Sequence, residues 1–271
     1  MPAANQRRGP ASVLPTGKRK PKTRMSEYSH AIYAAPGFGK TTWANDWPGA
    51  LFAACEPGTA ALEAAEVQVR SWEDFLTVLD AIEREDHDWS TFIVDTVDML
   101  HHFCRASVCR DLGISHPSEA AFAKGWALLS DRWTGAINRA SRLQTKSGRS
   151  ICSVFIAHEK RTALTENRDG RVIDTGRTLV TTNLAPSARG VLHSALDFVY
   201  HGEFAEADGP GGIKKGDRII RTQPAELPHS QIFAKGRGSL GQKLPEVLPL
   251  DFLALARAFN STFNGGENTN G

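Results

Sequence analysis

The sequence predicts an α/β fold with a mainly parallel central sheet, helices on both faces and an antiparallel C-terminal hairpin extension. Short apolar runs bounded by turn residues recur along the chain. Between them lie segments with apolar residues at three- and four-residue steps, which is the helical period. Strands that alternate with helices favour a parallel sheet covered on both faces. After residue 196 this alternation stops, which indicates the hairpin extension.

The expected elements follow these patterns in chain order. Strands are expected near residues 30–34, 50–55, 91–95, 151–157 and 196–204. Helices are expected over residues 72–85 and 120–144. The Gly-rich segment 209–216 predicts a turn, after which Arg-Ile-Ile-Arg-Thr-Gln pairs back on the last strand.

The domain organisation follows from composition. One domain is expected over residues 27–258, because 271 residues with 41% hydrophobic content can bury one substantial core. The polar residues 162–190 lack periodicity and predict a mobile loop, and residues 259–271 predict a disordered tail. No window reaches the ~18 consecutive apolar residues that span a bilayer, so we expect a cytoplasmic protein without a membrane partner.

Residues 1–26 predict a disordered basic arm, because they are rich in Pro, Gly and Lys. Such clustered cations would suit a nucleic-acid-binding arm, because they release counterions from a phosphate backbone. The alternatives are a solubilising leader or a misassigned start, with Met25 as a possible internal one. Before residue 25 the chain has no carboxylate and seven cations, namely Arg7, Arg8, Lys18, Arg19, Lys20, Lys22 and Arg24.

A phosphate-binding loop is predicted at residues 34–42, Ala-Ala-Pro-Gly-Phe-Gly-Lys-Thr-Thr, directly after the first apolar run. Backbone amides can surround phosphates only where small residues leave room, and a lysine must balance the charge. Lys40 meets that need, Thr41 would place its hydroxyl on Mg²⁺, and Ala34 stands where the usual first glycine is expected. The expected ATP-binding residues are Ala35, Pro36, Gly37, Phe38, Gly39, Lys40, Thr41 and Thr42.

Three further side chains follow expected strands. Asp95 ends Phe-Ile-Val-Asp and is predicted to hold Mg²⁺, although it could instead cap the next helix. For Asp98, capping or a surface charge is the favoured interpretation. Glu56 follows the second strand and is predicted to be the catalytic base, with a solvent-facing turn as the alternative. His158 follows the fourth strand and would sense the γ-phosphate or merely cap the strand.

These features, in this order, resemble the RecA-like core of short phage-encoded ATPases that include the Sak-type single-strand annealing proteins. The resemblance covers roughly residues 28–255. It is most specific in the phosphate loop, in Glu56-Pro57-Gly58, in Phe-Ala-Lys-Gly-Trp at 122–126 and in Ala-His-Glu-Lys at 157–160. It implies a RecA-like P-loop fold, ATP hydrolysis with Mg²⁺, and a homo-oligomer, ring or filament, with ATP between subunits.

The resemblance also implies two further sets of contacts. Lys235 and Arg237 match cations that complete a neighbour's ATP site. A DNA-contacting loop would contain Lys160, Arg161, Arg168, Arg171 and Arg177.

The resemblance therefore implies a DNA-stimulated ATPase that binds single-stranded DNA in phage recombination or annealing, with a single-strand-binding protein as a possible partner. The alternatives are a nucleotide-gated loader of the replication machinery that hydrolyses little, and a P-loop small-molecule kinase.

Overall fold

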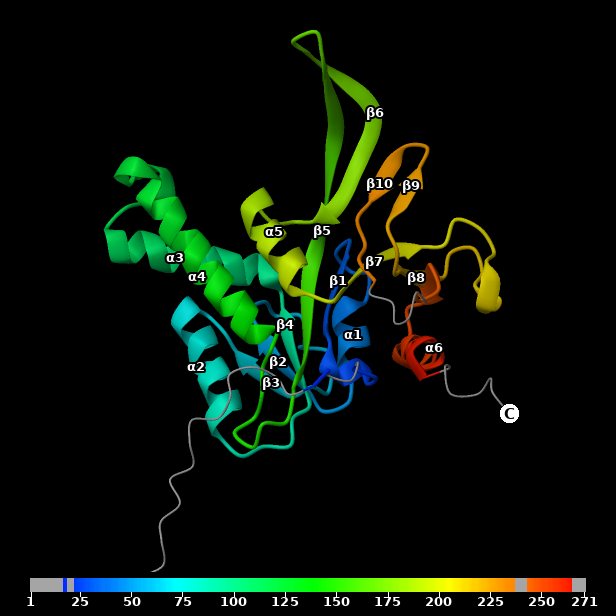
Figure 1. Ribbon diagram of the computed structural model, residues 1–271, viewed down its shortest axis with the longest axis horizontal. Coiled ribbons are helices and arrows are strands. Elements are labelled where there is room, and N and C mark those ends of the chain that lie inside the picture. Colours follow the sequence, from blue (N-terminus) through cyan, green and yellow to red (C-terminus); the bar gives the residue numbers. More distant parts are fainter. Residues whose placement is uncertain (1–16, 19–21, 237–242, 265–271) are drawn as a thin grey trace, which may run out of the picture.

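The computed structural model describes residues 17–18, 22–236 and 243–264, and these confirm the predicted α/β fold class (Figure 1). The central sheet has its strands in the order β11-β8-β7-β1-β5-β4-β2-β3, and β6, β10 and β9 continue it beyond β5. The strands are β1 (Ser29–Ala34), β2 (Ala50–Ala54), β3 (Glu66–Gln68), β4 (Thr91–Asp95), β5 (Cys152–Arg168), β6 (Arg171–Thr182), β7 (Phe198–Phe204), β8 (Arg218–Arg221), β9 (Ala225–Leu227), β10 (Ser230–Ile232) and β11 (Val247–Pro249).

The six neighbouring strands β7, β1, β5, β4, β2 and β3 run parallel to one another. Strands β8 and β11 add antiparallel pairs at the edge beside β7. The expected C-terminal hairpin is therefore confirmed as the β7–β8 pair. In a parallel sheet the carboxyl ends of the strands share one edge, where open α/β sheets bind their ligands. Here β5 lies between β1 and β4, so the segment after β1 and the end of β4 are one strand apart.

Six α-helices cover the two faces of this sheet in the part of the chain that is described. They are α1 (Lys40–Asn45), α2 (Trp72–Arg84), α3 (Val97–Leu112), α4 (Lys124–Ala140), α5 (Pro186–Ala195) and α6 (Phe252–Asn264). Helices α2 to α5 contribute to one hydrophobic cluster, while α1 and α6 contribute to a second cluster on the opposite face. None of the helices in the described ranges is long and apolar enough to cross a membrane.

The alternation of side chains along each strand explains these two clusters. On β1, Ala31 and Tyr33 join the first cluster, while Ile32 between them joins the second. Because both faces are covered, β1 and β4 are buried along their whole length. That is why the sequence shows continuous apolar runs at these strands, and why the strand positions could be predicted.

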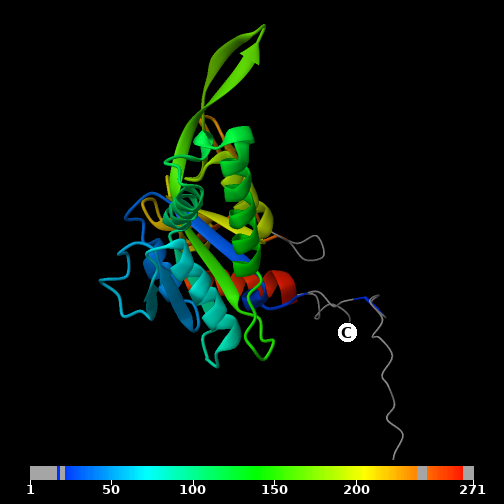
Figure 2. The same cartoon turned by 90° about the vertical axis from the view of Figure 1, so that its left-hand side faces the viewer.

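The loop expected over 162–190 is instead a long hairpin arm followed by α5. Strand β5 continues from the sheet to Arg168, and β6 pairs with it antiparallel from Arg171 to Thr182. Both views show this arm projecting beyond the rest of the molecule (Figures 1 and 2). The turn is Asp169-Gly170, with φ values of 54° and 77°, and Asp-Gly is a strong hairpin signal that composition alone obscured.

The two expected disordered ends also require correction where the structure describes them. Helix α6 continues through the start of the expected tail, because Phe259 is fully buried against the core. At the other end, Met25–Glu27 form a 3₁₀ turn, and Lys22 donates a hydrogen bond to the carbonyl of Glu27. Residues 1–16, 19–21 and 265–271, which contain the remainder of these expectations, lie outside the described residues.

The helix expected over 120–144 begins later, at Lys124, and ends at Ala140. Phe122 and Ala123 have φ values of 54° and 56°, so the chain turns sharply before the helix. Gly125 permits this turn to pack closely, since a Cβ there would stand 2.4 Å from the carbonyl oxygen of Pro117.

Candidate functional site

The predicted phosphate loop joins β1 to α1 at the carboxyl edge of the sheet. Gly37 and Gly39 have φ values of 74° and 98°, a conformation that favours glycine. The Lys40 side chain turns back over the loop, and its Nζ donates to the carbonyl oxygens of Ala34 and Ala35, both at 3.0 Å. Burial lowers the pKa of Lys40, while nearby carboxylates act in the opposite direction. The loop therefore holds one buried amine against its own backbone.

Phe38 anchors this loop to β7. Its side chain is 2% exposed and lies directly on Gly202, where a Cβ would approach Phe38 Cε1 to 2.4 Å. Only the absence of a side chain at Gly202 permits this contact. The aromatic residue in the middle of the loop is therefore a structural anchor that fixes the loop to the sheet.

Thr41 and Asp95 form the centre of the candidate metal position. The Thr41 hydroxyl donates to Asp95 Oδ2 at 2.7 Å. Asp95 is 4% exposed, and burial raises its pKa, against the opposing hydrogen bond from Thr41. Gly58 leaves the space above them open, since a Cβ there would stand 3.3 Å from Asp95 Oδ2 and 3.4 Å from Thr41 Oγ1.

These oxygens fit Mg²⁺, which takes one or two protein oxygens and completes its shell with phosphate and water. In the described ranges no cluster of three or more His, Cys, Asp or Glu residues could hold a metal without such help. A hydroxyl and a carboxylate beside the phosphate loop are consistent with a nucleotide-dependent Mg²⁺ position.

Glu56, which follows β2, lies among the same group of residues as Thr41 and Asp95. The β2–β4 register pairs Ala54 with Asp95, and the backbone N–H of Glu56 then donates to the Asp95 carbonyl at 3.2 Å. Thr96, which is 3% exposed, donates from its hydroxyl to Glu56 Oε1 at 2.7 Å. This bond fixes the carboxylate, so Glu56 is not a freely moving turn residue.

His158 stands where β5 passes the end of β1, paired with Ala34. Its backbone N–H donates to Asp98 Oδ2 at 2.9 Å, and its ring Nδ1 lies 3.7 Å from the same oxygen. Asp98 is therefore neither a surface charge nor the helix cap. Thr96 accepts the capping bond from the Met99 amide, and the side chain of Asp98 is 12% exposed.

A single cleft of about 360 Å³ brings together Glu56, Asp95, His158 and the predicted ATP-binding residues other than Ala35. Sequence reasoning missed Thr96, which directly follows Asp95 and lines the cleft, and Asp98, which bonds the backbone of His158 from the first turn of α3. The residues that line the cleft are Pro36, Gly37, Phe38, Gly39, Lys40, Thr41, Thr42, Glu56, Gly58, Asp95, Thr96 and His158.

Next to His158, Glu159 joins a buried ionic chain that crosses the sheet. Its carboxylate accepts from His201 Nε2 at 2.7 Å, and Glu203 lies 3.3 Å from His201 Nδ1. Burial alone would lower the pKa of His201, but the two carboxylates outweigh it and raise that pKa. Arg221 then pairs with Glu203 at 2.5 Å. This chain fixes β5, β7 and β8 to one another beside the phosphate loop.

The predicted DNA-contacting cations lie on the hairpin arm or at its base, away from the cleft. Lys160 and Arg171 are exposed. Arg161 pairs with Glu159 at 2.6 Å, and Arg177 pairs with Glu226. Arg168 lies at the end of β5. These cations are thus distributed along a ribbon rather than gathered on a loop, and of those whose side chains are described Arg161 and Arg177 are already paired.

Of the two predicted trans cations, Lys235 binds within its own chain. Its Nζ donates to the carbonyl oxygens of His193 and Leu196, at 2.7 and 2.5 Å, at the C-terminal end of α5. Arg237 lies outside the described residues. The contact of Lys235 with a neighbouring subunit stays a prediction, and the structure gives its ammonium a different, local partner.

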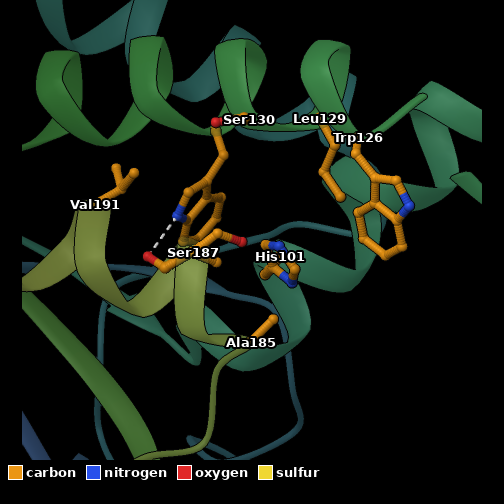
Figure 3. A pocket seen from close by; sticks show the side chains of 9 residues that line it. His101, Trp126, Leu129, Ser130, Ala185, Ser187 and Val191 are labelled. Carbon is orange, nitrogen blue, oxygen red and sulfur yellow. Dashed lines mark hydrogen bonds between the residues drawn. The ribbon is translucent and has the colours of Figure 1, made fainter. Parts of the chain in front are cut away.

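A second cavity of about 270 Å³ lies between α3, α4 and α5 (Figure 3). Trp126, Leu129 and Trp133 line one side, and Val191 and Ala188 line the other. Trp133 Nε1 donates to the Ala188 carbonyl at 3.0 Å, which ties the two helices together. This apolar cavity contains none of the predicted site residues.

Comparison with solved structures gives distant similarities. A prototypical ATPase from the type III secretion system of pathogenic bacteria has a TM-score of 0.41 and 10% identity, over 70% of this chain and 61% of that one. A second solved structure, of an isolated ATPase domain, has a TM-score of 0.40 and 11% identity, over 73% and 76% of the two chains. The KaiC-like protein PH0186 from Pyrococcus horikoshii OT3 has a TM-score of 0.37 and 12% identity, over 79% and 86%.

The comparison with protein families gives a match over most of the chain. No curated protein matches the sequence. A family model described as an AAA domain matches residues 26–238, from the turn before β1 to the segment after β10. The match includes the phosphate loop, Glu56, Asp95 and His158. With its P-loop geometry at the carboxyl edge of an α/β sheet, the chain belongs to the AAA domain family of P-loop ATPase-like proteins.

Proposed function

We propose that this chain is a Mg²⁺-dependent ATP hydrolase whose turnover is stimulated by single-stranded DNA. The observation that supports hydrolysis is the convergence of Lys40, Asp95 and Glu56 on one cleft of about 360 Å³. A positive amine, a metal-binding carboxylate and a second, separately oriented carboxylate are the groups that phosphoryl transfer to water requires.

Each residue has a distinct role in this proposal. Lys40 and the loop amides bind the phosphates, and Thr41 and Asp95 would hold Mg²⁺, which when bound neutralises phosphate charge. Glu56 orients the attacking water and accepts its proton, and the hydroxyl of Thr96 keeps that carboxylate directed into the cleft. His158 contacts the γ-phosphate from the end of the neighbouring strand.

The DNA part of the proposal rests on the hairpin arm. Exposed Lys160 and Arg171 lie on a ribbon that projects from the sheet (Figure 1), and cations on such a ribbon can contact a phosphate backbone. The arm begins at Glu159, directly after His158, so DNA bound there would act on the strand that carries the proposed γ-phosphate contact.

Assembly and biological role complete the proposal. We propose a homo-oligomer, ring or filament, that acts in phage DNA recombination or single-strand annealing, together with a single-strand-binding protein.

The test is the steady-state rate of ATP hydrolysis with and without single-stranded DNA, at low and moderate salt. Lys40→Ala is the control for contaminating ATPases and is expected to lose nucleotide binding. Stimulation by DNA that is absent from Lys40→Ala supports the proposal. Hydrolysis that is indifferent to DNA would favour a nucleotide-gated loader, and transfer of phosphate to a small molecule would favour a kinase.

A further inference from the structure

Arg218 lies against the phosphate loop on the side away from the hydrolytic residues. Its Nη1 is 3.2 Å from the point where a Cβ on Gly39 would stand, so the guanidinium covers the residue directly before Lys40. Leu250 lies beside it, with Cδ2 3.9 Å from the same point. Arg218 is on β8 and Leu250 follows β11, and neither residue was expected at the site from the sequence.

The guanidinium of Arg218 is available to a ligand. Its side chain is exposed, and among the described residues it has no hydrogen bond or ion pair. Arg221, three residues further along β8, is bound to Glu203 through two of its nitrogens. Strand β8 thus carries one arginine that is paired within the chain and one that, among the described residues, has no side-chain partner and lies beside Gly39 of the phosphate loop.

An exposed aromatic ring stands beside Arg218. Phe204 of β7 is its direct partner in the antiparallel ladder, and directly opposed residues share one face of the sheet. The ring of Phe204 is 55% exposed. It meets the buried ring of Phe38 edge to face, with 5.5 Å between the centroids. A planar cation, an aromatic ring and an aliphatic side chain therefore form one surface next to the phosphate loop.

The sheet order indicates which part of a nucleotide this surface would meet. Glu56, Asp95 and His158 follow β2, β4 and β5, which all lie on one side of β1, whereas β7 and β8 lie on the other. The terminal phosphate must lie toward the hydrolytic residues. A triphosphate bound along the loop then directs its nucleoside end away from them, toward β7 and β8.

We propose that Phe204, Arg218 and Leu250 form the nucleobase subsite of this ATPase. The flat faces of the guanidinium and the phenyl ring stack on the base, and Leu250 closes one side. Stacking on such groups tolerates different bases, so this subsite contributes affinity for the nucleoside end common to ATP and ADP. The proposal rests on the proposed function and adds the part of the ligand that the cleft residues do not recognise.

The experiment compares two ligands by calorimetric titration with Mg²⁺ present: ATP, and inorganic tripolyphosphate, which lacks the nucleoside. Arg218→Ala and Phe204→Ala are each expected to weaken ATP binding about 10-fold and to leave tripolyphosphate binding unchanged. Lys215→Ala is the matched control, because it removes an exposed cation from the preceding turn and should change neither affinity. Thermal melts of every variant verify folding.

Arg218→Lys distinguishes stacking from charge. Lysine keeps the charge and lacks the planar face, so its ATP affinity should match that of Arg218→Ala. Full recovery by lysine, equal losses for both ligands, or unchanged ATP affinity in both alanine variants would each overturn the nucleobase subsite. A wild-type protein that binds ATP no better than Lys40→Ala would instead overturn the proposed ATPase itself, and the subsite with it.

Discussion

Asp98 Oδ2 accepts the backbone N–H of His158 at 2.9 Å, while Asp98 Oδ1 is buried without a hydrogen-bond partner in the described structure. This bond joins the first turn of α3 to the point where β5 leaves the sheet for the hairpin arm. A buried carboxylate oxygen without a partner destabilises the ionised form. The ionised carboxylate of Asp98 is therefore only partly stabilised by hydrogen bonds within the protein.

The first prediction concerns the pH dependence of stability. Burial raises the pKa of Asp98 to about 6, although the N–H and ring of His158 oppose the shift, and Glu56 reinforces it. Between pH ~4 and ~6 the folded protein retains a proton that an unfolded chain releases, so the free energy of unfolding falls as pH rises through this window. Asp98→Asn keeps an acceptor for the His158 amide and removes the titration.

We therefore expect Asp98→Asn to be more stable than the wild type above pH ~6, by up to about 3 kcal/mol, with the difference vanishing near pH 4. Urea unfolding at pH 4, 5, 6 and 7 measures this difference. Parallel curves for the two proteins across that range would contradict the role assigned to burial of the carboxylate.

The second prediction concerns Glu56. Glu56→Gln keeps an oxygen for the Thr96 hydroxyl but cannot accept a proton, so it should bind ATP normally and hydrolyse it at least ~100-fold more slowly. Thr96→Val leaves the carboxylate in place and removes the bond that orients it, so a smaller loss is expected. Binding is measured by titration and turnover by phosphate release. Normal hydrolysis by Glu56→Gln would show that another group is the base.

The arrangement of the cleft could be anticipated because the phosphate loop, Glu56 and His158 each follow an apolar run and Asp95 ends another. Parallel strands bring such positions to one edge, so Lys40, Glu56, Asp95 and His158 could be placed together from the sequence. Asp98 could not, because its position depends on how α3 lies against β5. Arg218 depends on the register of the antiparallel edge, which a local pattern does not contain.

The hairpin arm was missed for a different reason. Its two strands are exposed on both sides for much of their length, so no apolar face marks a period of two. Only the Asp169-Gly170 turn indicated it. In exposed ribbons, therefore, hydrophobic periodicity does not predict the strands, and the residues of the turn are the remaining sequence signal.

The third prediction tests the anchoring of the phosphate loop. In Gly202→Ala the new methyl group would overlap the ring of Phe38, which should lower the free energy of unfolding by about 1–3 kcal/mol and weaken ATP binding. Adding Phe38→Leu should recover part of both losses, because a smaller side chain leaves room for the methyl group. Gly190→Ala, in α5 with no atom within 4 Å of its new Cβ, is the matched control. Additive effects of Gly202→Ala and Phe38→Leu in a double-mutant cycle would exclude this contact as the cause.

The fourth prediction separates two roles of Lys235. Its ammonium donates to two carbonyls at the end of α5, where a cation also offsets the negative end of the helix. Lys235→Met should therefore lower the free energy of unfolding by about 1–3 kcal/mol, measured in urea. Its rate of ATP hydrolysis, measured well below the melting temperature, should stay within a few-fold of wild type. A large loss of hydrolysis without a loss of stability would instead assign Lys235 to a neighbouring subunit's site. The hydrogen bonds of Lys235 within its own chain would then contribute nothing measurable to the free energy of unfolding.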